Sequence, residues 1–269
     1  MIYKIRRRKN ICASAFALAI TFVLCSCTNI ADRELEYVYI PSATSAPAEG
    51  VGGDLLVITT PAAETEAETW PAQPAIADPG VLTPQQQEFI NSCLFMGDSI
   101  CLGFGVYGLV SHCTAKAGAA ARNIEDFTFD SGGSQVSPYT AIVNSGCKNL
   151  VFLMGTNDVN MESVNDYIQY YNSFLTRVEA LAPGTNIYIL SITPVTASST
   201  FCYNYQIDEF NEAIMTMTET SSRRYVDVSS ALKDSQGNLR QEYASDNSVH
   251  LTKDAYYQIL AEFCRKVGA

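Results

Sequence analysis

From Thr83 to the C-terminus, short apolar runs alternate with amphipathic stretches, and this alternation constrains the fold more than any other feature of the sequence. The runs have the length and composition of buried strands and occupy residues 93–96, 114–117, 150–154, 187–192 and 225–228. Strands that alternate with helices join into a parallel sheet through right-handed crossovers, which place helices on both faces. The pattern therefore predicts a three-layer α/β/α sandwich with a five-stranded parallel sheet over residues 83–269.

Helical periodicity is clearest in the second half of this region. Apolar side chains recur at intervals of three and four residues within 164–178 and again within 207–217. The first of these stretches ends before Pro183-Gly184, a pair that stops helices. A third helix is predicted to begin after Thr252, a candidate N-cap, and to run to the C-terminus.

Residues 1–26 have the pattern of a bacterial lipoprotein signal peptide. A basic stretch precedes an apolar run of 14 residues, which is shorter than the roughly 20 residues that span a bilayer. The run ends in Leu24-Cys25-Ser26-Cys27, which resembles the lipobox and implies lipidation of Cys27. We therefore expect an extracytoplasmic protein held at the bacterial cell membrane by its lipid anchor; an ordinary secretory peptide cut nearby is the alternative.

Residues 27–82 are predicted to form a disordered tether. They contain six of the ten prolines and one basic residue, Arg33, and they lack the apolar surface that would offset the entropy of ordering. The whole chain carries a net charge of −11, and loss of the leader would leave 12 basic residues against 28 acidic ones. A surface this acidic repels phosphate, so nucleic-acid binding is disfavoured.

The cysteines and histidines limit the candidate metal and disulfide sites. Six cysteines remain beyond Cys27, an even number that permits up to three disulfides in an exported protein: Cys93, Cys101, Cys113, Cys147, Cys202 and Cys264. Several of them border apolar runs, where cysteine also serves as a small buried side chain, so no pairing is predicted. The two histidines, His112 and His250, and the absence of a C-x-x-C motif argue against a structural zinc site, and no cofactor is expected.

Small and polar residues follow three of the predicted strands at the points where those strands end. Ser99 follows the first strand, Gly118 the second and Asn157 the third, while His250 lies just before the last helix. Because the carboxyl ends of parallel strands meet at one edge of a sheet, we expect these four residues at that edge. Nucleophilic acyl transfer requires a serine hydroxyl beside an imidazole base and a set of N–H donors for the oxyanion.

These four segments resemble, in order and in approximate spacing, the four blocks of the SGNH (GDSL-type) hydrolases. The similarity rests on Gly97-Asp98-Ser99, Gly118, Gly155-Thr156-Asn157-Asp158 and His250, and it covers essentially all of 83–269. It implies a flavodoxin-like SGNH hydrolase fold with Ser99 as nucleophile and His250 as base. It also implies an oxyanion hole formed by the backbone N–H groups of Ser99 and Gly118 and the side chain of Asn157, with no metal.

One position departs from the family pattern. An aspartate usually lies three residues before the histidine, but here that position is Asn247 and Asp246 lies one residue further back. Asp246 could still reach His250 across a loop with one extra residue, or Asn247 could orient the imidazole in its place. A backbone carbonyl could also do so, which would leave a Ser–His dyad.

Two other features have alternative interpretations. The stretch 103–108 satisfies G-x-G-x-x-G, but it begins several residues beyond the end of the strand, so we interpret its glycines as close helix packing or a flexible site wall rather than a dinucleotide site. Asp98 and Asp158 are predicted to hold turns together rather than to react.

The resemblance implies a serine esterase acting on small acyl esters, and the tether favours acetyl groups on envelope or external polysaccharide. An O-acyltransferase acting on envelope glycan is one alternative, and a catalytically weak glycan-binding lipoprotein, suggested by Asn247, is another. Specificity is assigned to the variable loops 129–140 and 196–205. Their aromatic residues either stack on sugar rings or pack in the core: Tyr139, Phe201, Tyr203 and Tyr205.

Overall fold

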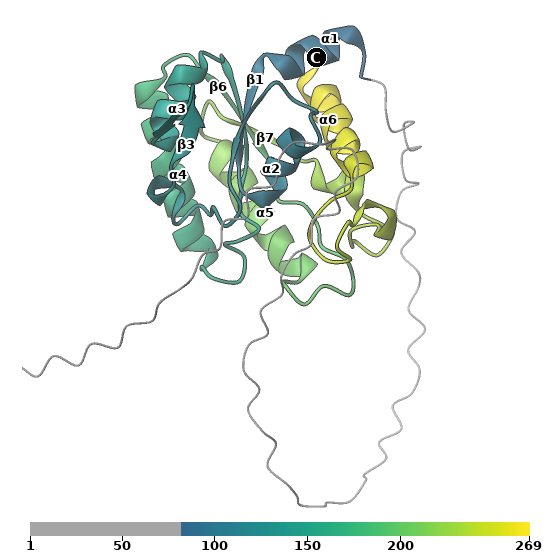
Figure 1. The fold of residues 1–269 in the computed structure, drawn as a ribbon. Coiled ribbons are helices and arrows are strands. Elements are labelled where there is room, and N and C mark those ends of the chain that lie inside the picture. Colours follow the sequence, from purple (N-terminus) through teal and green to yellow (C-terminus); the bar gives the residue numbers. More distant parts are fainter. Residues whose placement is uncertain (1–81) are drawn as a thin grey trace, which may run out of the picture. The chain divides into compact units, whose positions relative to one another are not determined.

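The computed structural model describes residues 82–269 (Figure 1). The predicted leader (1–26), Cys27 and the tether through residue 81 lie outside these residues. The main sheet consists of β1 (Cys93–Gly97), β2 (His112–Ala115), β5 (Asn149–Leu153), β6 (Asn186–Leu190) and β7 (Arg224–Val226), and a hairpin consists of β3 (Phe129–Ser131) and β4 (Ser134–Val136). The α-helices of this part are α1 (Pro84–Asn91), α2 (Ser99–Val106), α3 (Pro138–Ser145), α4 (Val164–Leu181), α5 (Asn204–Thr218) and α6 (Lys253–Val267). Short 3₁₀ helices are η1 (Ile124–Asp126), η2 (Ser229–Leu232) and η3 (Gln241–Tyr243).

The main sheet is parallel throughout, with the strand order β2-β1-β5-β6-β7. All five predicted strands are present, which confirms the predicted sheet. β1 pairs with β2 on one side and with β5 on the other, so the chain leaves β1 in one direction and later returns to its other side. Ligands of such sheets bind beyond the carboxyl end of the strand where the direction changes. Here that strand ends at Gly97.

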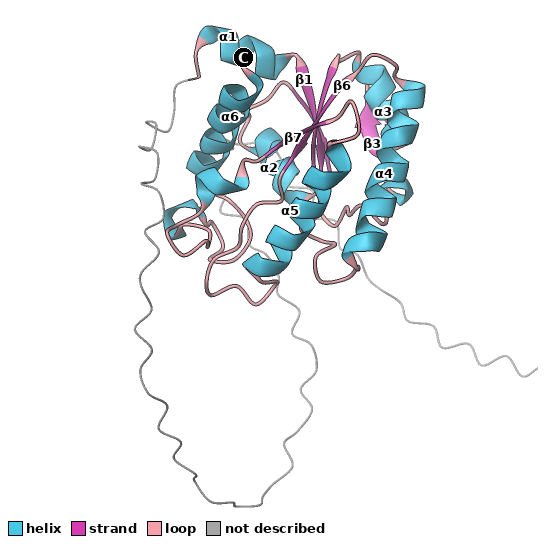
Figure 2. Cartoon of the chain, turned by 180° about the vertical axis from the view of Figure 1, so that it is seen from behind, coloured by secondary structure: helices cyan, strands magenta, loops and turns pink. Residues whose placement is uncertain are grey.

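Successive residues of the central strands face two separate cores. Phe95 and Val151 pack against α2 and α6, whereas Met96 and Phe152 pack against α3, α4 and α5. Figure 2 shows the sheet between these two layers, with α1, α2 and α6 on one side and α3 and α4 on the other. The apolar runs are continuous rather than alternating because both faces of each strand are buried. The predicted three-layer sandwich is therefore confirmed.

The structure contains elements that periodicity alone did not indicate. α2 is apolar at nearly every position and includes two glycines, so it has no polar stripe that would mark a helix. The stretch 129–140, interpreted above as a loop, instead contains the β3–β4 hairpin and the start of α3. Gly132 and Gly133 form the two-residue turn with φ of 63° and 83°, the left-handed geometry that such hairpins require.

All six cysteines of the described part are free, so none of the permitted disulfides forms within it. Cys93, Cys101, Cys202 and Cys264 are buried, in agreement with the use of cysteine as a small apolar side chain. No helix among residues 82–269 is long and apolar enough to cross a membrane.

Candidate active site

Ser99 begins α2 directly beyond the carboxyl end of β1. Gly97 makes this turn possible, since a Cβ atom there would lie 1.8 Å from the carbonyl oxygen of Leu153 on β5. Asp98 is the N-cap of the helix, and its carboxylate accepts a hydrogen bond of 2.9 Å from the N–H of Ile100. The half-buried Ser99 therefore lies at the positive end of a helix, where negative charge is stabilised.

The carboxylate of Asp98 joins the first and third blocks. Besides the α2 amides, it accepts a hydrogen bond of 3.4 Å from the N–H of Gly155, beyond the end of β5. Complete burial raises the pKa of Asp98 to about 6, although the N–H donors of Ile100, Cys101 and Gly155 lower it. Asp98 thus holds two strand ends together, the role predicted for it.

Asn157 brings the third block against the second. Its side-chain Nδ2 donates a hydrogen bond of 2.9 Å to the carbonyl oxygen of Ala119, the residue after Gly118. Gly118 itself is exposed and has a left-handed φ of 81°. Gly118 and Asn157, two of the three predicted oxyanion donors, consequently lie on adjoining segments at the carboxyl edge of the sheet.

Asp158 also joins the second and third blocks. Its buried carboxylate accepts from the N–H of Ala121 at 2.9 Å and lies 3.2 Å from Nη1 of Arg122. Burial raises the pKa of Asp158, and the contacts with Ala121 and Arg122 partly offset that effect. As predicted, this aspartate has a structural contact role. It joins the loop after β5 to the loop after β2 rather than closing a turn within one loop.

Asp246 lies behind the imidazole of His250. Nδ1 of His250 is 2.6 Å from Oδ2 of Asp246, while Oδ1 accepts hydrogen bonds from the N–H groups of Ser248, Val249 and His250 at 2.9, 2.9 and 3.0 Å. Partial burial raises the pKa of Asp246, but these hydrogen bonds outweigh burial and hold the pKa below its usual value. An ionised carboxylate can only accept, so Nδ1 carries a proton toward it and a neutral imidazole keeps its lone pair on Nε2.

Asn247 is directed elsewhere, which decides the geometric question that the sequence left open. It has a left-handed φ of 57°, its side chain accepts from Nε2 of Gln241, and its carbonyl oxygen accepts from Oγ1 of Thr196 at 2.7 Å. Asn247 is therefore the extra residue of the loop, and its left-handed turn lets Asp246 reach the imidazole from four residues away.

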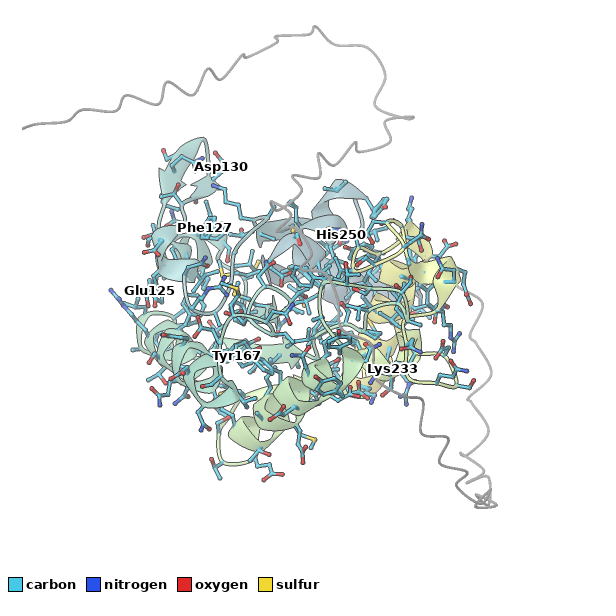
Figure 3. The ribbon with its side chains drawn as sticks, turned by 90° about the horizontal axis from the view of Figure 1, so that it is seen from below. Glu125, Phe127, Asp130, Tyr167, Lys233 and His250 are labelled. Carbon is cyan, nitrogen blue, oxygen red and sulfur yellow. The ribbon has the colours of Figure 1, made fainter. Side chains whose placement is uncertain are left out.

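The His250 loop lies at the same edge of the sheet as the other blocks. The N–H of Thr196, in the segment beyond β6, donates to the carbonyl oxygen of Ser248 at 3.0 Å. On the other side, Oη of Tyr256 in α6 donates to the carbonyl oxygen of Ile100 in α2 at 2.7 Å. Figure 3 views the molecule from this edge, with His250 labelled. No group of three or more His, Cys, Asp and Glu side chains among residues 82–269 is placed to hold a metal ion.

The glycine-rich stretch 103–108 has a packing role. A Cβ atom on Gly103 would lie 1.9 Å from Oη of Tyr256, so only glycine allows α2 and α6 to approach this closely. This agrees with the interpretation of the motif as helix packing. The contacts from Thr196 and Ser199 to the His250 loop, in contrast, had no sequence signal, because they join segments that are about fifty residues apart.

Comparison with known proteins agrees with this architecture. The family model for the GDSL-like lipase/acylhydrolase family matches residues 95–257, and no curated protein matches the chain. A GDSL-like lipase from Bacteroides thetaiotaomicron shares 16% identity at a TM-score of 0.51, with 67% of this chain and 89% of that chain covered. A catalytic mutant of an acetylxylan esterase from Geobacillus stearothermophilus shares 14% identity at a TM-score of 0.50, with 65% and 93% covered. At such identities these two likenesses show a common fold. The family match covers more than half of the chain and includes all four blocks, so the protein belongs to the GDSL-like lipase/acylhydrolase family and is an SGNH-type hydrolase.

Proposed function

We propose that this protein is a cell-surface serine esterase that removes small acyl groups, above all acetyl groups, from polysaccharide. The observation that carries the mechanism is the 2.6 Å contact between Asp246 and Nδ1 of His250, at the edge of the sheet where Ser99 begins α2. It orients the imidazole so that the Nδ1 proton is directed to a carboxylate and Nε2 is the nitrogen that can accept a proton from Ser99.

In the proposed reaction, Nε2 of His250 takes the proton of the Ser99 hydroxyl while Oγ attacks the ester carbonyl carbon. The carbonyl oxygen becomes an oxyanion, which accepts hydrogen bonds from the N–H groups of Ser99 and Gly118 and from Asn157. Collapse of this intermediate expels the sugar alkoxide, which takes the proton from His250. Water then attacks the acyl-serine by the same route and releases the carboxylic acid and free Ser99.

Asn157 is suited to the donor role by the bond it already makes. An amide NH₂ group has two N–H donors, and the bond to the carbonyl oxygen of Ala119 uses one of them. That bond fixes the side-chain orientation and leaves the second N–H for the oxyanion. Loss of one such donor typically raises the barrier by about 2.7–4 kcal/mol.

Two observations support the acetyl and polysaccharide parts of the proposal. One structure with the same fold is an acetylxylan esterase, and the sequence predicts a lipid anchor followed by a long tether. A tethered domain would sweep the glycan around the cell, which favours a polymeric substrate over a diffusible one.

The proposal is tested by acetate release from acetylated polysaccharide and from 4-nitrophenyl acetate with the full-length protein. Wild type should release acetate and react with a fluorophosphonate at Ser99, whereas Ser99→Ala should lose both properties. Equal activity in Ser99→Ala would refute the mechanism. Adding a sugar acceptor separates hydrolysis from acyl transfer, because transfer yields acylated acceptor in place of acetate.

A further inference from the structure

Three aromatic side chains between the loop after β6 and the first turn of α5 remain exposed, although neighbouring residues of this segment are buried or hydrogen-bonded. Phe201, Tyr203 and Tyr205 are 41%, 63% and 68% exposed, whereas Tyr139, in the other variable stretch, is buried and packs on Phe174. The rings of Tyr203 and Tyr205 are nearly parallel, with an interplanar angle of 12° and centroids 5.7 Å apart. Contiguous exposed apolar side chains, such as this stacked pair with Phe201 two residues before it, are typical of interaction surfaces. We call these three residues the aromatic platform.

The platform is held rigidly. Asn204 closes the base of the loop, because its Oδ1 accepts from the N–H of Val195 at 2.9 Å and its Nδ2 donates to the carbonyl oxygen of Val195 at 2.8 Å. Cys202, between Phe201 and Tyr203, is buried in the core. An aromatic side chain on a fixed backbone loses little conformational entropy when it binds a ligand. The platform is therefore preorganised for binding.

The platform is continuous with the candidate active site. Oγ of Ser199 lies 2.9 Å from Oγ of Ser248, and Thr196 bonds to both Asn247 and Ser248. The loop that carries the platform is therefore bonded directly to the loop that carries His250. The segment that carries the platform therefore lies at the same edge of the sheet as His250.

The chemistry of the segment favours a neutral, hydroxylated partner. Residues 192–207 contain no charged side chain and are rich in Ser, Thr and Tyr, within a chain of net charge −11. Anionic lipid surfaces and anionic polymers recruit basic residues, which this segment lacks. Tyrosine combines a flat apolar ring with a polar hydroxyl, and this combination suits the apolar faces and hydroxyl rims of sugar rings.

We propose that the aromatic platform binds pyranose rings of a neutral polysaccharide and thereby presents an acyl substituent of that polymer to Ser99. This inference rests on the proposed esterase function for its second half only, because binding of the polymer does not require turnover. It assigns polymer specificity to Tyr203 and Tyr205, which have no role in bond cleavage.

Binding is tested with the full-length protein carrying Ser99→Ala, in gels that contain glucomannan or xylan. The protein should be retarded, and the double variant Tyr203→Ala/Tyr205→Ala should bind about tenfold more weakly. Tyr203→Phe/Tyr205→Phe keeps the rings and should still bind, and Tyr170→Ala, which removes an exposed tyrosine from α4, is the matched control. Absence of retardation, or equal retardation of the Ala and Phe double variants, would overturn the platform. Binding of wild type to phosphatidylglycerol vesicles that is lost in the Ala variant would also overturn it in favour of a membrane surface.

Turnover distinguishes the two proposals. With Ser99 restored, the Ala double variant should have a KM for acetylated glucomannan or xylan raised about tenfold, with kcat and the activity on 4-nitrophenyl acetate unchanged. An equal loss on the small ester would mean that the rings support the active site, which contradicts a docking role. If wild type binds the polymer through the platform but releases no acetate from any ester, the esterase proposal fails and the platform stands.

Discussion

Asp98 and Asp246 are two carboxylates at the same edge of the sheet, and each accepts three backbone N–H hydrogen bonds. Asp98 is completely buried, spans the ends of β1 and β5, and has its pKa raised by burial to about 6. Asp246 is partly exposed and adds the imidazole of His250 as a further partner, and its pKa is lowered. Matching sets of backbone donors thus produce opposite shifts, because water access and a fourth partner decide the charge state. The difference indicates a structural role for Asp98 and supports the role that we propose for Asp246 behind His250.

The largest effect is expected from removing the carboxylate behind the imidazole. Asp246→Ala should lower kcat by about 10³–10⁴-fold, since the imidazole loses both its orientation and the charge that stabilises its cationic form. The folded protein should persist, because the N–H groups of the exposed loop can bond to water. Ester turnover and a thermal melt measure the two effects. A modest loss of kcat would show that His250 works as part of a dyad.

The reverse pattern is expected at Asp98. Asp98→Ala leaves three buried N–H donors without an acceptor, each at a cost of about 1–3 kcal/mol, so unfolding should become easier by about 3 kcal/mol or more. Urea denaturation measures this loss, and Asp98→Asn, which keeps an acceptor oxygen, should lose less. If Asp98→Ala were as stable as Asp246→Ala, the structural assignment of Asp98 would be wrong.

The pH dependence of stability should have opposite signs for the two carboxylates. Asp98 titrates near 3.8 when unfolded and at about 6 when folded, so the native state binds more protons between these values and this contribution to stability falls as pH rises. The change amounts to about 3 kcal/mol and should disappear in Asp98→Asn. The contribution of Asp246, whose pKa is lowered, is present above the usual carboxyl pKa and is lost as pH falls. Urea denaturation of wild type, Asp98→Asn and Asp246→Asn from about pH 2 to 7 covers both titrations, and slopes of the same sign would contradict the comparison.

The smallest effect is expected at Asn247. Glycine adopts a φ of 57° without strain, so Asn247→Gly should change stability by about 1 kcal/mol or less and kcat by about threefold or less. Ester turnover and urea denaturation provide the measurements. A loss of kcat comparable to that of Asp246→Ala would mean that Asn247, not Asp246, orients His250.

The fold was largely predictable because the strands and the three long helices each have one dominant pattern. The continuous apolar runs marked strands buried on both faces, and α4, α5 and α6 have clear apolar stripes. α2 escaped prediction for a physical reason, since it packs on the sheet and on α6 and so needs small and apolar residues rather than a polar face.

The site was predictable as a set of segments but not as a set of contacts. The four blocks can be read in order, yet whether Asp246 or Asn247 faces His250 depends on one left-handed residue and on its bonds to Gln241 and Thr196. These partners lie on different segments, and no local pattern encodes them. The lipid anchor and the tether stay predictions, because they fall outside residues 82–269.

The close approach of Gly103 to Tyr256 has a consequence for how this protein can vary. Any larger side chain at 103 would collide with the ring that bonds to Ile100, one residue after the nucleophile proposed here. A larger side chain at 103 is therefore tolerated only together with a smaller side chain at 256. Substitutions at the two positions should accordingly occur together. Residue 103 belongs to the helix that begins at Ser99, and residue 256 belongs to the helix that follows His250. Paired changes at these two positions would therefore preserve the packing that holds Ser99 and His250 in position relative to one another.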